Sequence, residues 1–432
     1  MISGLRTVLC VASVLLFYGA HAALPFRGNI HAKGAVLINA ETGAVLYESN
    51  AHLPLHPSST TKVFTALYAL ERKGECLDEM ICASTDATLY VTPQIRRAVD
   101  GRHPHYRLEF GGTHMRLKAG EILPLRILLY GLMLSSGNDA ANVIGEYVSG
   151  SVPRFLEELN RFAASKGCLN TRLYNPHGLH SPEHKTTAYD LAIASMHAMQ
   201  YPFFREVVKS VNYERPLSNK QAEVVLPQHN HLVRPGKFYY PKATGVKTGY
   251  TASGGYSLVA SAENEERSLI AVLLSCEKLE DRYGDAIALF EAAFNEKKVS
   301  RTLFAKGFDV FTCAVAGGKG PLQAYLLSDV AISFFPSEEP TLKSVIEWDA
   351  LTLPVSAGAR VGQVLMRSQE GRLLASADLY AIRAVEPTFY FRVQTQMQAV
   401  RKGVREHVTL VLISLAALIF LATFFRYHRP LR

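Results

Sequence analysis

Runs of apolar residues predict two groups of β-strands that lie far apart along the chain. Residues 34–38 and 44–48 flank a polar loop, and both runs are rich in residues that favour strands. Much later, residues 244–251 and 256–262 are joined across the Gly254-Gly255 turn, and residues 269–275 follow as a third run. We therefore predict an N-terminal hairpin and a later group of three strands.

Between these two groups, apolar residues recur at helical spacing. Pro57 disfavours helix at the residue before it, and Ser58 or Ser59 can cap a first helical turn. The positions that then predict a helix are Val63, Phe64, Leu67 and Leu70. Residues 123–133 form a second apolar helical run, and residues 186–190 begin a third helix with a capping pattern.

The stretch at residues 83–117 is polar and harder to assign to helix or strand. We interpret it as a surface insertion, because it carries Arg96, Arg97, Arg102, His103, His105 and Arg107. Metal binding by His103 and His105 is an alternative interpretation.

The two ends of the chain indicate export and membrane attachment. Arg6 precedes a short apolar run, and Ala20-His21-Ala22 offers a signal-peptidase site, so we predict a signal peptide at 1–22; an uncleaved anchor is the alternative. Residues 408–425 are apolar and uncharged, which predicts a transmembrane helix after a linker at 396–407 and before a cytoplasmic tail at 426–432. A buried amphipathic helix is the alternative for 408–425. The export signal predicts a single-pass membrane protein whose folded part lies on the extracytoplasmic side.

The remaining length accommodates two folded domains. Residues 304–385 contain short alternating apolar runs separated by glycine-rich and proline-rich turns, which is typical of a small all-β domain. We place a first domain at 23–296 and this β-rich domain at 297–395.

Charge and cysteine content argue against a nucleic-acid-binding protein and against a zinc protein. The net charge of +8 is spread along the chain, which favours contact with anionic membrane or wall surfaces over binding of nucleic acid. Five of the six cysteines follow the predicted signal peptide; Cys76 and Cys82 are near enough in sequence to close a small loop. No spacing of cysteine and histidine indicates zinc, and we predict no cofactor or metal.

Candidate chemistry begins at the helix after Pro57. Ser59 and Lys62 are three residues apart, so they share one helix face, and an amine of lowered pKa can remove the proton of a serine hydroxyl. The same spacing at Ser275 and Lys278 shows that the pattern also arises by chance. A helix cap with a surface lysine is therefore the alternative interpretation of Ser59.

Two further motifs can complete such a site. Ser136 and Asn138 place a hydroxyl and an amide side by side between two predicted helices, where they can relay a proton and hold a substrate amide. Lys247-Thr248-Gly249 combines a cation and a hydroxyl on a predicted strand, which suits a terminal carboxylate, while glycine permits close approach of a substrate. An exposed strand lysine is the alternative for Lys247.

In this order, the three motifs resemble those of the penicillin-binding and serine β-lactamase superfamily. The residues around them narrow the resemblance to the low-molecular-mass D-alanyl-D-alanine carboxypeptidases. Those segments are Pro57-Ser58-Ser59-Thr60-Thr61-Lys62, Ser136-Gly137-Asn138-Asp139-Ala140, Asn175-Pro176-His177-Gly178-Leu179 and Lys247-Thr248-Gly249-Tyr250-Thr251. The resemblance implies an α+β fold in which the hairpin and the late strands form one antiparallel sheet flanked by helices.

The resemblance also implies roles for individual residues. Ser59 would be the acylated nucleophile and Lys62 its general base, and Ser136 would pass a proton to the leaving amine. The substrate-binding residues would be Asn138, Lys247, Thr248, Gly249 and Tyr250, with the backbone N–H groups of Ser59 and Tyr250 forming the oxyanion hole. The implied substrates are peptidoglycan stem peptides, and β-lactams would acylate Ser59 covalently.

Three features depart from the family pattern. Ser58 stands where alanine is common, the segment at 83–117 is longer than expected, and no motif supplies the deacylating glutamate of class A β-lactamases. A D,D-endopeptidase, a β-lactamase and a non-catalytic wall-binding scaffold remain as alternative functions.

Overall fold

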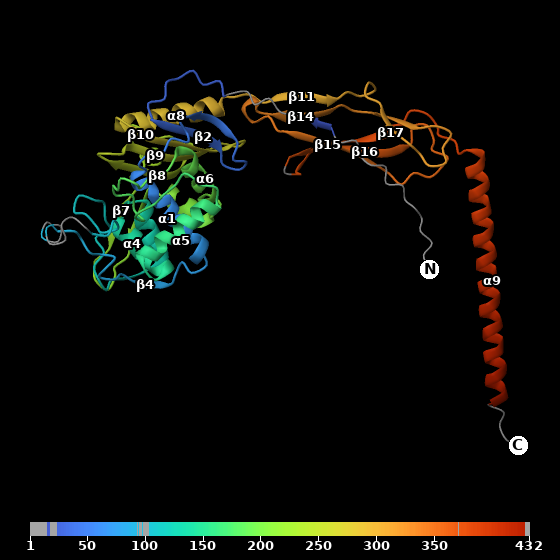
Figure 1. Ribbon diagram of the computed structural model, residues 1–432, viewed down its shortest axis with the longest axis horizontal. Coiled ribbons are helices and arrows are strands. Elements are labelled where there is room, and N and C mark those ends of the chain that lie inside the picture. Colours follow the sequence, from blue (N-terminus) through green and yellow to red (C-terminus); the bar gives the residue numbers. More distant parts are fainter. Residues whose placement is uncertain are drawn as a thin grey trace. The chain divides into compact units, whose positions relative to one another are not determined.

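The computed structural model describes residues 15–17, 24–92, 94, 97, 103–369 and 371–427. The chain divides into two compact units (Figure 1). One contains His21–Lys297 together with Phe335–Glu338, and the other contains Met1–Ala20, Lys298–Phe334 and Glu339–Arg432. We refer to the first as the catalytic unit, because it holds all the candidate site residues, and to the second as the β-rich unit.

A five-stranded antiparallel sheet organises the catalytic unit. Its order is β3 (Val45–Ser49), β2 (Gly34–Asn39), β10 (Ser268–Cys276), β9 (Gly255–Glu263) and β8 (Ala243–Thr251). The predicted hairpin and the three late strands therefore do join, because β10 pairs with β2 on one side and with β9 on the other. The nearly continuous apolar runs of β2 and β10 reflect burial of both faces of these strands.

Helices cover both faces of this sheet (Figure 1). On one face lies α8 (Leu279–Phe294), which buries Tyr283, Leu289 and Phe290 against Leu37, Leu258 and Leu273. On the other face lies a larger helical region whose core includes Phe64, Leu67, Leu128 and Leu191. Its helices are α1 (Lys62–Lys73), α3 (Leu125–Met133), α4 (Asn138–Ser149), α5 (Val152–Ser165), α6 (Ala188–Ala198) and α7 (Pro202–Lys209).

Two small hairpins complete this unit. The hairpin of β4 (Met80–Cys82) and β5 (Ile122–Pro124) precedes α3, and the hairpin of β6 (Asn212–Arg215) and β7 (Val224–Pro227) follows α7. The helix predicted at 123–133 therefore starts slightly later, at Leu125. The predicted cap of α6 is confirmed, since the side chain of Thr187 accepts a hydrogen bond from Asp190 N.

The interpretation of 83–117 as a surface insertion is wrong for its second half. Tyr106, Leu108, Met115 and Leu117 are buried. Asp139 at the start of α4 fixes this segment, because its carboxylate accepts hydrogen bonds from Met115 N and Leu117 N, both at 2.9 Å. The polar composition hid these contacts, which are made largely by the backbone. Arg96 and Arg102 lie outside the described residues.

The β-rich unit is built mainly of strands, as its alternating apolar pattern predicted, and these strands form two sheets. The larger has the order β1 (Leu15–Phe17), β15 (Leu342–Trp348), β16 (Arg360–Ser368), β17 (Leu373–Ala381), β13 (Leu322–Leu326) and β12 (Phe311–Cys313). The smaller pairs β11 (Val299–Phe304) with β14 (Val330–Phe334). Strand β1 belongs to the predicted signal peptide, most of which lies outside the described residues.

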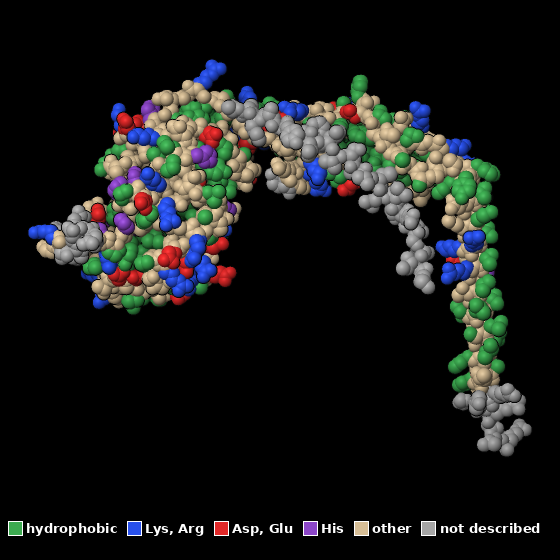
Figure 2. All heavy atoms as spheres, in the orientation of Figure 1, with side chains coloured by type: hydrophobic (Ala, Val, Ile, Leu, Met, Phe, Trp, Pro, Cys, Tyr) green, Lys and Arg blue, Asp and Glu red, His purple; other side chains and the backbone are tan. Residues whose placement is uncertain are grey.

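The chain ends in α9 (Phe389–Tyr427), which includes both the predicted linker and the predicted transmembrane segment in one helix. Within the described residues, it is the one helix long and apolar enough to cross a membrane. Hydrophobic side chains cover its lower part in Figure 2, below a band of Lys and Arg. None of the apolar window is buried in the protein, so the alternative of a buried helix does not hold here.

Candidate active site

Ser59 lies in a single 3₁₀ turn, η1 (Ser58–Thr61), that leads directly into α1. The predicted position of Ser59 at a helix N-terminus is therefore confirmed. The predicted cap is wrong, because no side chain caps either η1 or α1. Ser58 instead adopts a positive φ of 53°, and its Oγ lies 2.9 Å from Thr251 Oγ1 at the end of β8. The two adjacent serines thus have different surroundings: Ser58 ties the turn to the sheet, and Ser59 lines a cleft.

Lys62 is fully buried, and its amine contacts three oxygen atoms. Nζ lies 3.0 Å from Ser59 Oγ, 2.7 Å from Asn138 Oδ1 and 2.7 Å from the His177 carbonyl oxygen. A neutral amine has two N–H donors and one lone pair. The amide and carbonyl oxygens can accept the two N–H groups, which leaves the lone pair for the Ser59 hydroxyl. The three contacts therefore satisfy both N–H groups and the lone pair of a neutral Lys62 amine, which is the form that a general base requires.

The surroundings of Lys62 favour that neutral form. Burial is the largest cause that lowers the pKa of Lys62 well below its usual value, and the positive charge of Lys247 is the second. The Asp139 carboxylate opposes both and raises the pKa. Since desolvation and a like charge both disfavour the ammonium, the site supplies two of the physical means by which a lysine becomes a base.

Ser136 and Asn138 come from the loop between α3 and α4, as predicted. Ser136 is buried with a positive φ of 58°, and its carbonyl oxygen accepts a hydrogen bond from Thr113 Oγ1 at 2.6 Å. Asn138 N donates to Thr113 O at 2.9 Å, so the same residue holds both ends of the motif. Asn138 then contacts Lys62 directly, while Ser136 lines the same cleft as Ser59.

Lys247 and Thr248 lie on β8, with almost no exposed surface on the lysine. Lys247 Nζ donates to Thr248 O at 3.0 Å. Burial, and after it the charge of Arg282, lowers the pKa of Lys247 to about 7. Lys247 is therefore not the exposed strand lysine of the alternative interpretation.

Gly249 brings β8 against the turn that carries Ser59. A Cβ atom at this position would lie 3.0 Å from both Pro57 O and Ser59 N. The absence of a side chain at Gly249 thus permits the close approach of β8 to the nucleophile turn, and Gly249 also lines the cleft. Tyr250 follows with 56% of its surface exposed, and its ring stacks on Tyr256 with centroids 4.4 Å apart.

The turn at residues 175–178 packs against the turn that carries Ser59. Gly178 has a φ of 92°, and a Cβ there would lie 1.8 Å from Ser58 O. His177 is fully buried, and burial lowers its pKa well below the usual value. As a neutral ring it can accept from Leu179 N at Nδ1 and donate from Nε2 to Tyr106 O. This histidine therefore has a structural role, and its carbonyl helps to position Lys62.

Three residues of the site were not identified from the sequence. Arg282 on α8 is buried and donates to Gly249 O and Ser257 O, at 3.0 and 3.2 Å. Thr113 and His229 line the cleft, and burial followed by the charge of Lys247 lowers the pKa of His229 to about 4. An arginine among the mostly apolar buried residues of α8, which also include Asp285, was the one available signal for Arg282. Thr113 and His229 belong to no recognisable motif.

These residues surround one open cleft of about 700 Å³. Its lining includes Ser59, Ser136, Asn138, Thr248, Gly249 and Tyr250, with Thr113, His229 and Arg282. Lys62 and Lys247 are buried next to it. The cleft therefore brings together segments that are separated by more than two hundred residues of sequence.

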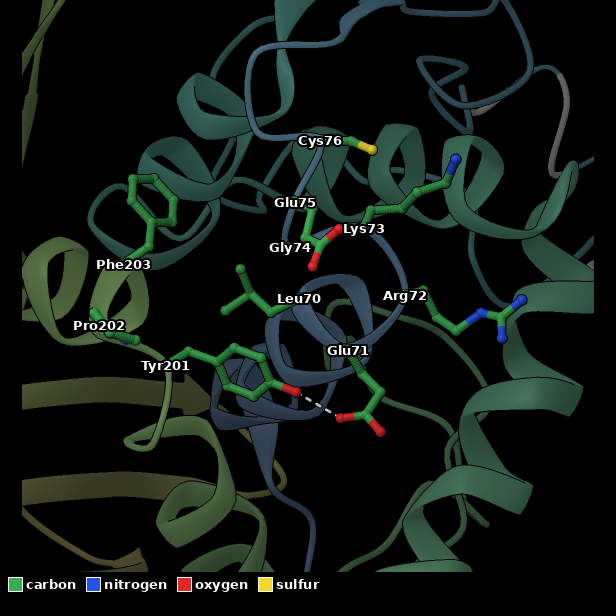
Figure 3. A pocket seen from close by; sticks show the side chains of 10 residues that line it. All are labelled: Leu70, Glu71, Arg72, Lys73, Gly74, Glu75, Cys76, Tyr201, Pro202 and Phe203. Carbon is green, nitrogen blue, oxygen red and sulfur yellow. Dashed lines mark hydrogen bonds between the residues drawn. The ribbon is translucent and has the colours of Figure 1, made fainter. Parts of the chain in front are cut away.

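A second hollow, of about 550 Å³, lies at the end of α1 and contains none of the candidate residues (Figure 3). Glu71 is its central acid, and it accepts a hydrogen bond from Tyr201 Oη at 2.5 Å and pairs with Lys166 at 3.5 Å. The Glu71 carboxylate is therefore partnered by Tyr201 and by Lys166, and none of the residues that line this hollow belongs to the candidate site.

His184, Cys76 and Cys82 do not line the cleft. His184 Nε2 lies 2.9 Å from Thr61 Oγ1, and its Nδ1 accepts from Tyr174 N. Burial lowers the pKa of His184 to about 3. Cys76 and Cys82 are exposed and unpaired with each other, so the small loop suggested by their spacing is not closed by a disulfide. The described residues include no group of three or more side chains placed to hold a metal ion.

Comparison with known proteins gives consistent matches. A family model described as D-alanyl-D-alanine carboxypeptidase matches residues 20–278. The chain is 28% identical to the D-alanyl-D-alanine carboxypeptidase DacF of Bacillus subtilis, over 81% of this chain and 85% of that protein. It is 26% identical to DacD of Escherichia coli, over 83% and 90% of the two chains.

Solved structures agree with the sequence matches. The Streptomyces K15 DD-transpeptidase superposes with a TM-score of 0.53 at 26% identity, over 62% of this chain and 98% of that one. Penicillin binding protein 6B from Escherichia coli gives a TM-score of 0.58 at 22% identity, over 84% and 99% of the chains. The second likeness extends beyond the catalytic unit into the β-rich unit.

Proposed function

Because the chain belongs to the D-alanyl-D-alanine carboxypeptidase family, we propose that it is a serine peptidase that removes the terminal D-alanine from peptidoglycan stem peptides through an acyl-enzyme on Ser59. The observation that carries this proposal is the 3.0 Å contact between Ser59 Oγ and the buried amine of Lys62. A serine hydroxyl becomes a nucleophile at neutral pH when such a base accepts its proton.

In the acylation step, Ser59 Oγ attacks the carbonyl carbon of the penultimate D-alanine while its proton passes to Lys62. The backbone N–H groups of Ser59 and Tyr250 would donate to the oxyanion that forms. Preorganised donors of this kind typically contribute about 3–4 kcal/mol each to stabilisation of the transition state. The close contact of Gly249 with Ser59 N supports this role, because it sets the separation of the two segments that carry these donors.

The amide bond then breaks, and the leaving amine requires a proton. Ser136 is the candidate donor, since it lines the cleft beside Ser59 and its loop is fixed by Thr113. The proton removed from Ser59 can return to the leaving D-alanine through Lys62 and Ser136. Water then attacks the acyl-enzyme, releases the shortened peptide and restores the Ser59 hydroxyl.

Lys247 and Thr248 are the proposed binding site for the terminal carboxylate. Binding of an anion would favour the charged form of Lys247, whose pKa of about 7 leaves it partly neutral in the free enzyme. Arg282 would add positive potential behind Gly249. A substrate that lacks the carboxylate should therefore bind poorly.

The experiment that tests this function uses the full chain in detergent. The protein is incubated with a stem pentapeptide, and products are identified by mass spectrometry; release of one D-alanine is expected. A fluorescent penicillin should label Ser59 with a long-lived adduct. Rapid release of hydrolysed penicillin would favour a β-lactamase, and absence of labelling with retained muropeptide binding would favour a non-catalytic scaffold.

We further propose that α9 anchors the protein with both folded units on the extracytoplasmic side. The apolar part of α9 follows Arg401, Lys402 and Arg405 and has the length of a single span. Protease added to intact spheroplasts should remove the folded units and leave α9 with the membrane. Protection of the folded units would contradict this orientation.

A further inference from the structure

The first half of α9 carries a line of apolar side chains that lies outside the proposed membrane span. These side chains recur at alternating intervals of three and four residues. They are Tyr390, Val393, Met397, Val400 and Val404. Such spacing aligns them along one side of a helix, and it is the heptad spacing of helices that pair as coiled coils. We call this line the α9 stripe.

In a single copy of the chain, the α9 stripe is open to solvent along most of its length. Val393 is half-buried, whereas the other four side chains are between 58% and 76% exposed. Figure 2 shows hydrophobic side chains on α9 above as well as below its band of Lys and Arg. A continuous line of exposed apolar surface is typical of a site that contacts another molecule.

Membrane lipid does not cover the stripe if residues 408–425 span the bilayer. α9 runs from Phe389 to Tyr427 as one helix, and this sequence contains no proline that would kink it. Residues 389–407 therefore extend outward from the span, over about 28 Å. Arg401, Lys402 and Arg405 also favour water for this part of the helix. We therefore expect a protein, and not lipid, to cover the stripe.

The charged side chains of this part of α9 are placed away from the stripe. In the heptad a to g, the stripe occupies positions a and d, and the positions e and g beside it hold Gln394, Gln396, Arg401 and Gly403. The charged residues at the outer positions b, c and f are Arg392, Lys402, Arg405 and Glu406. Of these, Arg392 pairs with Glu386 at 2.6 Å and Lys402 pairs with Glu406 at 3.9 Å, both within one chain. The stripe is therefore an apolar seam with one charged residue per helix beside it.

A second copy of the same chain suits this surface. Two copies anchored in one membrane have parallel helices at the same depth, so their identical stripes meet in register. In such a pair, Gln396 at position g of one helix faces Arg401 at position e of the other, which avoids repulsion between like charges. The same line continues into the span through His407, Val411 and Ser414, and small or polar residues are common where membrane helices pack.

We propose that two copies of this protein associate through the α9 stripe as a parallel pair of helices. Each assembly then carries two active-site clefts, and pairing removes the stripe from water without involving the residues of either cleft. This inference goes beyond the proposed peptidase activity, and it rests on the proposed membrane anchor.

The first test measures the mass of the full-length protein in detergent by sedimentation equilibrium. Wild type should sediment as a dimer. Met397→Lys places a cation in the centre of the seam on both helices, so the apparent dissociation constant should rise at least tenfold. Gln398→Lys is the matched control, because it adds the same charge one residue further along, at an outer position. This control should sediment as wild type does.

The second test uses disulfide crosslinking in native membranes. Cys76 and Cys82 are first replaced by serine, because both are exposed. Val400→Cys then places a thiol on the stripe, and Lys402→Cys places one on the outer face of the same turn. Oxidation should link Val400→Cys into a dimer at least tenfold more efficiently than Lys402→Cys.

The inference is overturned if wild type sediments as a monomer, if both lysine variants have the same dissociation constant, or if both cysteine variants crosslink equally. Fluorescent penicillin should label every variant at the wild-type rate, because the stripe lies outside the cleft. Failure of the proposed peptidase function is distinguishable, since labelling would then be absent while the dimer persisted. Release of wild type from membranes by alkaline carbonate would refute the anchor, and this inference with it.

Discussion

Lys62 Nζ and Ser59 Oγ are 3.0 Å apart at the edge of the cleft, although only the serine faces it. The three-residue spacing places both on one side of the same helical turn. The spacing does not make the lysine a base. Burial under the 175–178 turn and the charge of Lys247 lower its pKa, and both come from distant parts of the chain.

Replacement of the nucleophile is the first prediction. Ser59→Ala removes the only oxygen placed next to Lys62 that can be acylated, so D-alanine release should fall on the order of 10⁴-fold or more. Penicillin labelling of the same residue should be lost. Release of D-alanine from a pentapeptide, followed by mass spectrometry, measures the first effect, and gel fluorescence measures the second.

Ser58→Ala is the neighbouring control. It removes only the hydrogen bond to Thr251, which contributes about 1 kcal/mol to stability, so most of the activity should remain. An equal loss of activity in Ser58→Ala and Ser59→Ala would indicate damage to the turn, and it would not identify Ser59 as the nucleophile.

The pH dependence of kcat/KM is the second prediction. At low pH the rate should fall because Lys62 becomes protonated and can no longer accept a proton. At high pH it should fall with a midpoint near 7, because Lys247 loses the charge that binds the carboxylate. Steady-state kinetics from pH 5 to 9 with a D-Ala-D-Ala substrate should therefore give a bell-shaped profile.

A substrate that ends in D-alaninamide separates the two limbs. It has no carboxylate, so it should react more slowly near neutral pH. Its pH profile should show the fall in kcat/KM at low pH but not the fall at high pH. An identical alkaline limb with both substrates would assign that limb to a group other than Lys247.

The sequence predicted most of the sheet and the three motifs, because each depends on local patterns. Strands β2, β3, β8, β9 and β10 are marked by apolar runs between turn residues, and Ser59 follows a proline that ends the preceding segment. The prediction that the hairpin and the late strands form one sheet came from the family resemblance. Pairing between β2 and β10 links residues more than two hundred positions apart, which no local pattern specifies.

The errors have a common physical origin in backbone contacts. The segment at 106–117 is polar in sequence, yet its backbone N–H groups donate hydrogen bonds to Asp139 and its Tyr106 carbonyl oxygen accepts one from the side chain of Asn142. Gly249 also lies against the backbone of η1, a contact that the sequence did not indicate. Side-chain patterns do not encode where one backbone segment approaches another.

The contact between Gly178 and the nucleophile turn gives the third prediction. Gly178→Ala adds a Cβ that would overlap Ser58 O, at a φ that already disfavours alanine. We expect a loss of about 2–3 kcal/mol in the free energy of unfolding. Displacement of Ser59 from Lys62 should also slow penicillin acylation at least tenfold, as measured by stopped-flow or gel assays.

Gly167→Ala is the control that separates the effect of backbone strain from the effect of the contact between residue 178 and Ser58. Gly167 has a similar φ of 89°, but nothing lies within 4 Å of the position of its Cβ. It should lose about 1 kcal/mol of stability and keep its acylation rate. Equal acylation rates in the two variants would show that the packing of Gly178 does not position the site.

The buried His184 gives the fourth prediction, which concerns stability as a function of pH. Its pKa in the folded protein is about 3, against an ordinary value of 6.5, so the unfolded chain takes up a proton between these values while the folded chain does not. Its contribution to stability is therefore fully present above pH 6.5 and is lost as the pH falls toward 3, by about 1.4 kcal/mol per pH unit.

His184→Gln removes the titrating group, so the difference in free energy of unfolding between wild type and variant should shrink by about 2 kcal/mol from pH 7 to pH 5. Urea unfolding of the detergent-solubilised chain, followed by circular dichroism, measures this difference. Parallel pH profiles for wild type and His184→Gln would show that His184 is accessible to protons in the folded state.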